Sequence, residues 1–506
     1  MLAWTIYISF LGMAVLMFVP RGNARAARIV ALLAAVAGCV VAFAGAIAGG
    51  ASLNTICKLP WVSSLGIDYH LASDGISLTL VMLTGIASVV GILFSWNIEH
   101  RAKEFFAFYL ALIGGVYGVF LSFDLFLLFV FYELAIIPKY FLIAIWGSTR
   151  KEYGAMKLAL YSFVGSAMVL IGIVAAYVVA GAKTMDLFEL AKFPFPESFQ
   201  YWAFPLVFVG FAILAGLWPF HTWAPTGHVA APTAASMLLA GVIMKLGAYG
   251  ALRVAMTLFP FGSKAWAGTI ATLAVIGIVY GAMVALTQKD FKFVIGYSSV
   301  SHMGFVILGL MTLNEIGLSG AVLQMFSHGI IAGLLFGVVG RMVYDRTHTR
   351  DLSVLEGMNL AKGIPFAAVT FVIASVASMG LPGFSGFVAE LQVLIGAWHA
   401  FPTFAVLTGI GILVGVAYTL RALQLAFFGE AKEEQTVGAL APAVGNGGGA
   451  HHSGELEPIS VPERTGAVIL IAATLVIGLY PRLLLDLIVP SFNGPLFDGL
   501  RKAVAL

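Results

Sequence analysis

Apolar stretches of about 20 residues recur along the whole of this 506-residue chain. A helix needs about 20 apolar residues to cross the hydrocarbon of a bilayer. Only 10% of the residues are charged and 60% are hydrophobic, so a water-soluble fold could not cover the apolar surface. We therefore predict an all-α membrane protein with about 14 transmembrane helices. Some links between spans are so short that 13 or 15 helices are also compatible with the sequence. They fall near residues 1–20, 29–52, 76–96, 105–122, 124–146, 154–181, 202–224, 231–256, 265–287, 293–312, 317–343, 364–398, 403–428 and 465–487.

Two of these spans are predicted to be broken. The seventh contains Pro219 and then Pro225, which predicts two interruptions. The twelfth is too long for one straight span, and its centre, GLPGFSGF, holds Pro382 and Gly383. Broken helices survive in a membrane only where protein or water satisfies the freed backbone groups, and in transporters they mark ion sites.

Lysine and arginine are concentrated in alternate links, which predicts the orientation of the chain. Because basic links face the cytoplasm, the links holding Arg21, Arg101, Arg150, Lys289 and Arg346 are expected there. Both termini then face the opposite side. The N-terminal stretch has no basic region and no small-residue cleavage site, so we expect it to be the first span rather than a removed signal.

Several functional classes are disfavoured by composition. A net charge of +3 gives no reason to expect nucleic-acid binding, and the two cysteines make neither a metal motif nor a disulfide framework. The sequence shows no cysteine cluster for iron–sulfur ligation and no dinucleotide fingerprint, so we expect no redox cofactor in this chain. The polar segment 429–464 predicts a flexible surface loop, in which a solvated role for His451 and His452 is favoured over metal binding.

Ionisable residues recur inside the predicted spans. Each costs at least about 2.5–3.5 kcal/mol at the bilayer centre, so such residues are functional candidates by default. Alternatives exist for single positions: a lone histidine can be structural, Lys157 can extend its amine to the interface, and Glu133 with Lys245 can be a structural ion pair. Burial moves carboxyl and amine pKa values towards neutrality, so the set as a whole predicts a proton path. The residues assigned to this path are Glu133, Lys139, Lys157, Lys245, His302, His328 and Glu390, and His221 and His228 are further ionisable residues beside the break after the seventh span.

Four long motifs resemble one known family. FYELAIIPKYFLIAIWGSTRKEYGAMKLALY, PFHTWAPTGHVAAPTAASMLLAGVIMKLGAYGALR, KDFKFVIGYSSVSHMGF and MGLPGFSGFVAEL are similar to subunit M of NADH–quinone oxidoreductase, respiratory complex I. The resemblance implies two inverted five-helix repeats, each with one broken helix. The expected organisation is then N-terminal helices in 1–104, repeats in 105–256 and 265–428, the loop 429–464, and a last helix with its tail in 465–506.

The resemblance also implies roles for the buried charges. Glu133 matches the acid of an ion pair on the fifth span, and Lys245 matches the central lysine of the eighth. His302 and His328 match the path between two half-channels, and Glu390 matches the terminal acid, where we expect a lysine in subunits L and N. The implied partners are subunits L and N, small membrane subunits and chains holding FMN and iron–sulfur clusters, with quinone as acceptor, in the inner membrane of a bacterium.

Three positions depart from the family pattern. The lysine expected five residues before Pro219 is Leu214, and a methionine expected after Pro138 is Lys139. We predict that the amine has moved to Lys139, which lies about 9 Å along the axis from Glu133 and about 120° around it in a straight helix. The alternative is that Lys139 extends to the interface and the pair is lost. Thr226 stands where the family has an acid, for which the sequence offers no explanation.

Three functions fit these features. The first is a proton-translocating subunit of complex I. The second is a subunit of an Mrp-type cation/proton antiporter, a relative with the same fold. The third is a structural spacer of the membrane arm that, lacking the lysine at position 214, pumps nothing.

Overall fold

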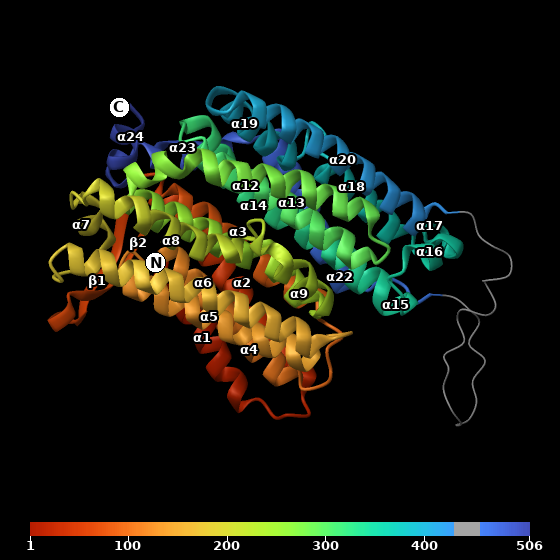
Figure 1. The fold of residues 1–506 in the computed structure, drawn as a ribbon. Coiled ribbons are helices and arrows are strands. Elements are labelled where there is room, and N and C mark those ends of the chain that lie inside the picture. Colours follow the sequence, from red (N-terminus) through yellow and green to blue (C-terminus); the bar gives the residue numbers. More distant parts are fainter. Residues whose placement is uncertain (430–455, 506) are drawn as a thin grey trace.

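The chain forms a bundle of long helices in the computed structural model, which describes residues 1–429 and 456–505 (Figure 1). Within these residues, 12 helices are long and apolar enough to cross a membrane, or 13 if α23 and α24 count as one bent span. The prediction of a polytopic all-helical membrane protein is thereby confirmed. Of the 14 predicted spans, the first corresponds to α1 (Ala3–Phe18) and half of the twelfth to α18 (Pro365–Ser378), both shorter than a full span.

The remaining elements follow the predicted order. They are α2 (Ala24–Gly49), α3 (Gly75–Phe94), α4 (Ala102–Leu121), α5 (Leu125–Trp146), α6 (Lys151–Val179), α7 (Leu187–Lys192), α8 (Glu197–Ala215), α9 (Trp223–Ala230), α10 (Thr233–Leu238), α11 (Met244–Gly250), α12 (Pro260–Thr287), α13 (Phe291–Met311), α14 (Glu315–Phe336), α15 (Asp345–Thr347), α16 (Leu352–Leu355), α17 (Leu360–Gly363), α19 (Ser385–Ala400), α20 (Pro402–Phe427), α22 (Val461–Leu479), α23 (Arg482–Phe492) and α24 (Asp498–Ala505). Three π-helical segments, η3 (Leu239–Ile243), η4 (Ala251–Met256) and η5 (Gly337–Tyr344), interrupt the α-helices of two spans.

Burial separates an inner layer from an outer one. The segments Thr233–Met256 and Glu315–Thr347 are buried along their apolar lengths, whereas α2, α20 and α22 expose most of theirs. The inner segments are therefore surrounded by protein rather than lipid. This arrangement lets them carry charged side chains that a lipid-facing helix could not.

Both predicted breaks coincide with interruptions between helices. Pro219 sits between α8 and α9, and Pro382 and Gly383 sit between α18 and α19. Gly380 and Gly383 have φ values of +72° and +99°, which residues with a side chain rarely adopt. The second interruption predicted in the seventh span is wrong. Pro225 lies in the first turn of α9, where its missing N–H removes no helical hydrogen bond.

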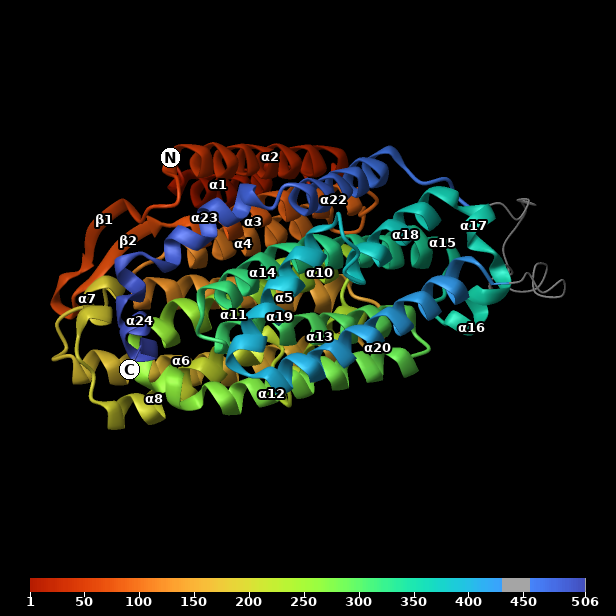
Figure 2. The same cartoon turned by 90° about the horizontal axis from the view of Figure 1, so that it is seen from above.

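Links with many basic residues gather at one end of the bundle. Arg28 donates to the backbone oxygen of Ile98, Trp146 to that of His100, and Arg350 to the Ser148 hydroxyl. Figure 2 shows α15, α16 and α17 at this end, and both chain ends, α7 and two β-strands at the other. The grouping of the links matches the sequence pattern. Which end faces the cytoplasm stays a prediction.

An unpredicted β-hairpin lies between α2 and α3. Strand β1 (Asn54–Val62) pairs with β2 (Ile67–Ser73) in antiparallel register, with a turn at Gly66. A Cβ on Gly66 would overlap the backbone of Lys183, so the turn packs directly on the link before α7. The hairpin thus ties an early part of the chain to the first predicted repeat.

Two similar backbone bridges occur at opposite ends of the bundle. Asp124 and Asp186 cap the N-termini of α5 and α7 and face each other in an isolated antiparallel bridge. Asp290 and Asp351 do the same for α13 and α16. In each case two backbone hydrogen bonds of 2.8–2.9 Å join the flanking residues. This correspondence supports the two inverted repeats, which remain a prediction.

The last predicted span ends earlier than expected. The helix over 465–487 is instead α22, which ends at Leu479, and Pro481 precedes the separate helix α23. The residues expected to form a tail are helical, since α23 and α24 follow each other with a bend of 55°. His451 and His452 lie outside the described residues.

Candidate functional site

Lys245 and His228 are the two candidates with no exposed surface, and Lys245 has the more polar surroundings. It lies on α11, between the π-helical segments η3 and η4, and has no exposed surface. Its ammonium donates to the backbone oxygen of Ala240 and lies 2.7 Å from Nδ1 of His328 on α14. Because π-helical turns are rare and often mark functional positions, two of them flanking a buried lysine single out this site.

A continuous row of side chains leads away from Lys245. The ring of His328 stacks on the ring of His302, on α13, with centroids 5.4 Å apart. Nδ1 of His302 lies 3.1 Å from a carboxylate oxygen of Glu390, on α19 just after the break. Lys245, His328, His302 and Glu390 thus come from four helices and form one row, which we call the central line.

Polar groups surround the far end of the central line. The hydroxyl of Ser378, at the end of α18, lies 3.2 Å from Nε2 of His302, and the amide of Gln324 lies 3.5 Å from the Glu390 carboxylate. A cavity of about 10 Å³ lies beside His302 and Glu390, and Tyr418 lines its other side. That volume is close to the smallest that holds one water molecule.

Glu133 and Lys139 lie apart from the central line, on α5. Lys139 is buried, and its ammonium is 3.1 Å from the hydroxyl of Ser162 on α6. One carboxylate oxygen of Glu133 is buried and has no hydrogen-bond partner among the described residues, although the Ser166 hydroxyl faces the carboxylate. No ion pair within 4.0 Å joins Glu133 to Lys139 in the described part of the chain. The two serines stand one helical turn apart on α6.

Leu214 is buried in a tight contact between helices. A Cβ on Gly247 of α11 would lie 3.0 Å from the backbone carbon of Leu214 on α8. The two helices therefore approach closely at the position where relatives of the family were expected to carry a lysine. An apolar side chain fills this position here.

Lys157 binds the residue whose identity the sequence left unexplained. Its ammonium on α6 lies 3.3 Å from the hydroxyl of Thr226 on α9. An acid at position 226 would form an ion pair with Lys157, whereas threonine offers a neutral acceptor. Lys157 therefore contacts the segment after the first break rather than the central line.

Two further histidines follow that break. His221 and His228 are buried, and the ring nitrogens of both have no hydrogen-bond partner among the described residues. The His228 ring stacks on Phe336 of α14 with centroids 4.7 Å apart. His228 thus packs against α14, the helix that also carries His328.

A buried ion pair was missed by the sequence reasoning. Arg253 on η4 donates two hydrogen bonds, of 2.7 and 2.6 Å, to the carboxylate of Asp74, the N-cap of α3. Both side chains are buried, and the Tyr249 hydroxyl bonds to Arg253 and Ser77. The arginine inside the apolar run of the eighth predicted span was the available signal. Its partner, 179 residues earlier, could not be identified from sequence.

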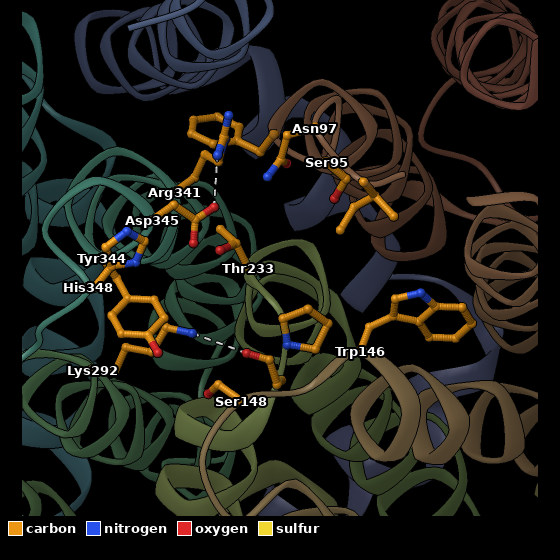
Figure 3. A pocket seen from close by; sticks show the side chains of 14 residues that line it. Ser95, Asn97, Trp146, Ser148, Thr233, Lys292, Arg341, Tyr344, Asp345 and His348 are labelled. Atoms are coloured by element: carbon orange, nitrogen blue, oxygen red, sulfur yellow. Dashed lines mark hydrogen bonds and ion pairs between the residues drawn. The ribbon is translucent and has the colours of Figure 1, made fainter. Parts of the chain in front are cut away.

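A polar cavity of about 340 Å³ opens at the end where the basic links gather (Figure 3). The buried ammonium of Lys292 points into this region and bonds to the backbone oxygen of Ala231 at 3.1 Å. Arg341 pairs with Asp345 at 2.9 Å on its wall and also with the buried Glu463 of α22. The cavity therefore brings charged groups of α13, η5 and α15 together above the buried core.

A bundle with two broken helices and a buried line of lysine, histidine and glutamate defines an antiporter-like membrane subunit. Residues 122–415 match the family described as NADH:quinone oxidoreductase/Mrp antiporter, transmembrane. The chain belongs to this family. Among its relatives is NADH-quinone oxidoreductase subunit M of Rhodobacter capsulatus, 36% identical over 94% of this chain and 93% of the relative. The same subunit of Escherichia coli K12 is 34% identical over 96% of both chains.

Solved structures agree with this assignment. A chain of respiratory complex I from Thermus thermophilus with bound NADH superposes with a TM-score of 0.86 at 26% identity, covering 100% of both chains. A chain of the Mrp complex from Dietzia shares the fold, with a TM-score of 0.84 at 22% identity, covering 100% of this chain and 98% of the other. The protein is accordingly a multi-pass subunit of the bacterial cytoplasmic membrane that resembles subunit M throughout its length.

Proposed function

We propose that this chain translocates protons across the membrane as a membrane-arm subunit of an NADH–quinone oxidoreductase. The observation that carries the proposal is the central line, in which amine, imidazoles and carboxylate from four helices lie in contact. These are the groups that exchange protons near neutral pH when burial moves their pKa values. Lys245, His328 and Glu390 are buried, and His302 is only 12% exposed, so the line lies mainly within the protein.

The contacts suggest how a proton moves along the central line. Lys245 and His328 share a hydrogen bond, and Nδ1 of His302 lies 3.1 Å from the Glu390 carboxylate, so each of these two transfers would need no intermediate group. The two imidazoles stack instead, and their contact offers no hydrogen bond. The middle step therefore requires a ring rotation or a bridging water. This step is the natural gate between the two halves of the line.

Coupling to electron transfer would come from partner chains. FMN, iron–sulfur clusters and the quinone site are expected in other subunits of the complex, and this chain supplies no redox group in the proposal. Its expected neighbours are the antiporter-like subunits L and N and small membrane subunits. Energy would reach the central line through contacts with these neighbours that change the relative stability of the stacked and the rotated arrangement of the two imidazole rings.

The relocated amine is a second part of the proposal. Lys139 provides the buried amine that Leu214 lacks, and Glu133 provides the acid. Because no direct ion pair joins them, their coupling would run through the hydroxyls of Ser162 and Ser166 or through water between them. Lys157, held by Thr226, would feed this pair from the side of the first helix break.

The test measures protons pumped per electron in vesicles that contain the assembled complex. Lys245→Met and Glu390→Gln should each lower this ratio while quinone reduction continues. Lys264→Met, which removes an exposed lysine of α12, is the matched control and should leave the ratio unchanged. Normal assembly with an unchanged ratio in both test variants would instead support the structural spacer. Sodium-dependent transport without quinone reductase would support the Mrp-type alternative.

A further inference from the structure

An apolar groove of about 660 Å³ runs along one outer face of the bundle. Its floor is made by α3 and α14, and its walls by α2 on one side and α22 with α23 on the other. Figure 2 shows α22 and α23 running beside α2 and α3. The floor residues Met82, Ile86 and Phe326 are less than a tenth exposed, so the groove reaches well into the bundle.

The groove ends at two opposite charges. Arg482 and Asp486 lie one turn apart on α23 and line the same end, next to Tyr480. Both charged side chains are exposed, and neither forms an ion pair within 4.0 Å with a described residue. The first turn of α23 therefore presents a cation and an anion together at the mouth of an apolar slot.

The position of the groove matches one leaflet of a bilayer. It extends from the middle of α3 to Gly50 and Leu487, at the end of the bundle that carries the β-hairpin. Its apolar length thus lies at hydrocarbon depth, and its charged end lies where lipid headgroups begin. Tyr480 is the type of aromatic residue that is enriched at this interface.

From these features we infer that the groove binds one phospholipid with an ethanolamine headgroup. Its phosphate accepts hydrogen bonds from Arg482, its ammonium donates to Asp486, and one acyl chain fills the slot above Phe326. A lipid tail gains little by leaving other tails for an apolar wall, so selectivity resides in the headgroup. The phosphate of a phosphatidylglycerol would satisfy Arg482, but its neutral glycerol would offer Asp486 no cation. A zwitterionic lipid satisfies both.

The experiment compares lipids retained by the complete purified complex. The complex is delipidated, exchanged into equal amounts of phosphatidylethanolamine and phosphatidylglycerol, and analysed by native mass spectrometry. We expect the parent complex to retain one phosphatidylethanolamine at this site, with a preference of roughly tenfold over phosphatidylglycerol. Ala473→Trp, which fills the slot, should remove that one equivalent. Val468→Trp, on an exposed part of α22 outside the groove, is the matched control and should keep it.

A second variant keeps the inference falsifiable if Ala473→Trp does not assemble. Asp486→Asn changes only an exposed side chain and should reduce the preference to about one, because the ammonium loses its partner. Equal retention in Ala473→Trp and Val468→Trp, or an unchanged preference in Asp486→Asn, would overturn the inference. A cross-link from Ala473→Cys to a neighbouring subunit would also overturn the inference, because a protein helix would then occupy the groove.

Discussion

Removing Arg253 should destabilise the subunit far more than removing the whole ion pair. In Arg253→Met, the carboxylate of Asp74 stays buried and keeps only the N-cap bond from the backbone of Ser77, at 2.9 Å. Leaving one charge of a buried pair without its partner typically costs about 3–5 kcal/mol. In the double variant Arg253→Met with Asp74→Asn, the buried charge is gone and asparagine still caps α3. Most of the loss should therefore be recovered.

These energies translate into a measurable shift in melting temperature. For a chain of 506 residues, an unfolding entropy of about 2.1 cal/mol/K per residue corresponds to about 1 °C per kcal/mol. Arg253→Met should lower the apparent melting temperature of the purified complex by about 3–5 °C, and the double variant by less than half of that. Differential scanning fluorimetry provides the readout.

Comparing the single and double variants shows whether the unpaired Asp74 charge causes the loss of stability. A coupling energy of about 2 kcal/mol or more between positions 253 and 74 is expected for a buried pair whose members depend on each other. If the double variant melts lower than Arg253→Met, the loss would come from missing packing around the arginine, such as its contact with the Tyr249 ring. The ion-pair explanation would then be refuted.

Three further predictions follow from the described contacts. Lys139→Met should lower protons pumped per electron in vesicles, with Lys192→Met on exposed α7 as control, and an unchanged ratio would reject the relocated amine. Burial raises the pKa of Asp186, but hydrogen bonds from His70 and Lys58 outweigh it and lower the pKa to about 2. The pKa of an unperturbed aspartate is about 3.9, so these contacts should hold the β-hairpin against the link before α7 above about pH 4. The hairpin should detach as the pH falls towards 2, which hydrogen exchange of its backbone amides would detect. Glu463→Gln should lower the melting temperature by about 2–4 °C, because the buried Arg346 loses its counter-charge and the partly exposed Arg341 keeps only Asp345.

The sequence predicted those features that repeat along the chain or depend on nearby residues. Apolar length located the spans, and glycine and proline located the breaks around Pro219 and Gly383. Pro225 misled because a proline breaks a helix only beyond its first turn, and the start of α9 depends on tertiary packing. The β-hairpin was missed because its exposed first strand has no apolar alternation, and its pairing depends on contacts with the link before α7.

The site was predictable as a set of residues, but not as a set of contacts. Lys245, His328, His302 and Glu390 could be named from their burial in apolar runs and from family motifs. Their order in space depends on how four helices pack, which periodicity does not encode. The Arg253–Asp74 pair shows the same limit, because each residue can be buried as an ion only where the other lies beside it.

If protons pass along the central line as proposed, its four members act in series, one after another. Each of the four residues lies on a different helix. A small rigid shift of any one helix would therefore interrupt the proton path as completely as the loss of a side chain. Two substitutions in the line should lower the number of protons pumped per electron no further than one substitution does. Pairs of substitutions along the line are therefore expected to be strongly non-additive, whereas a substitution in the line combined with one at Lys139 should add.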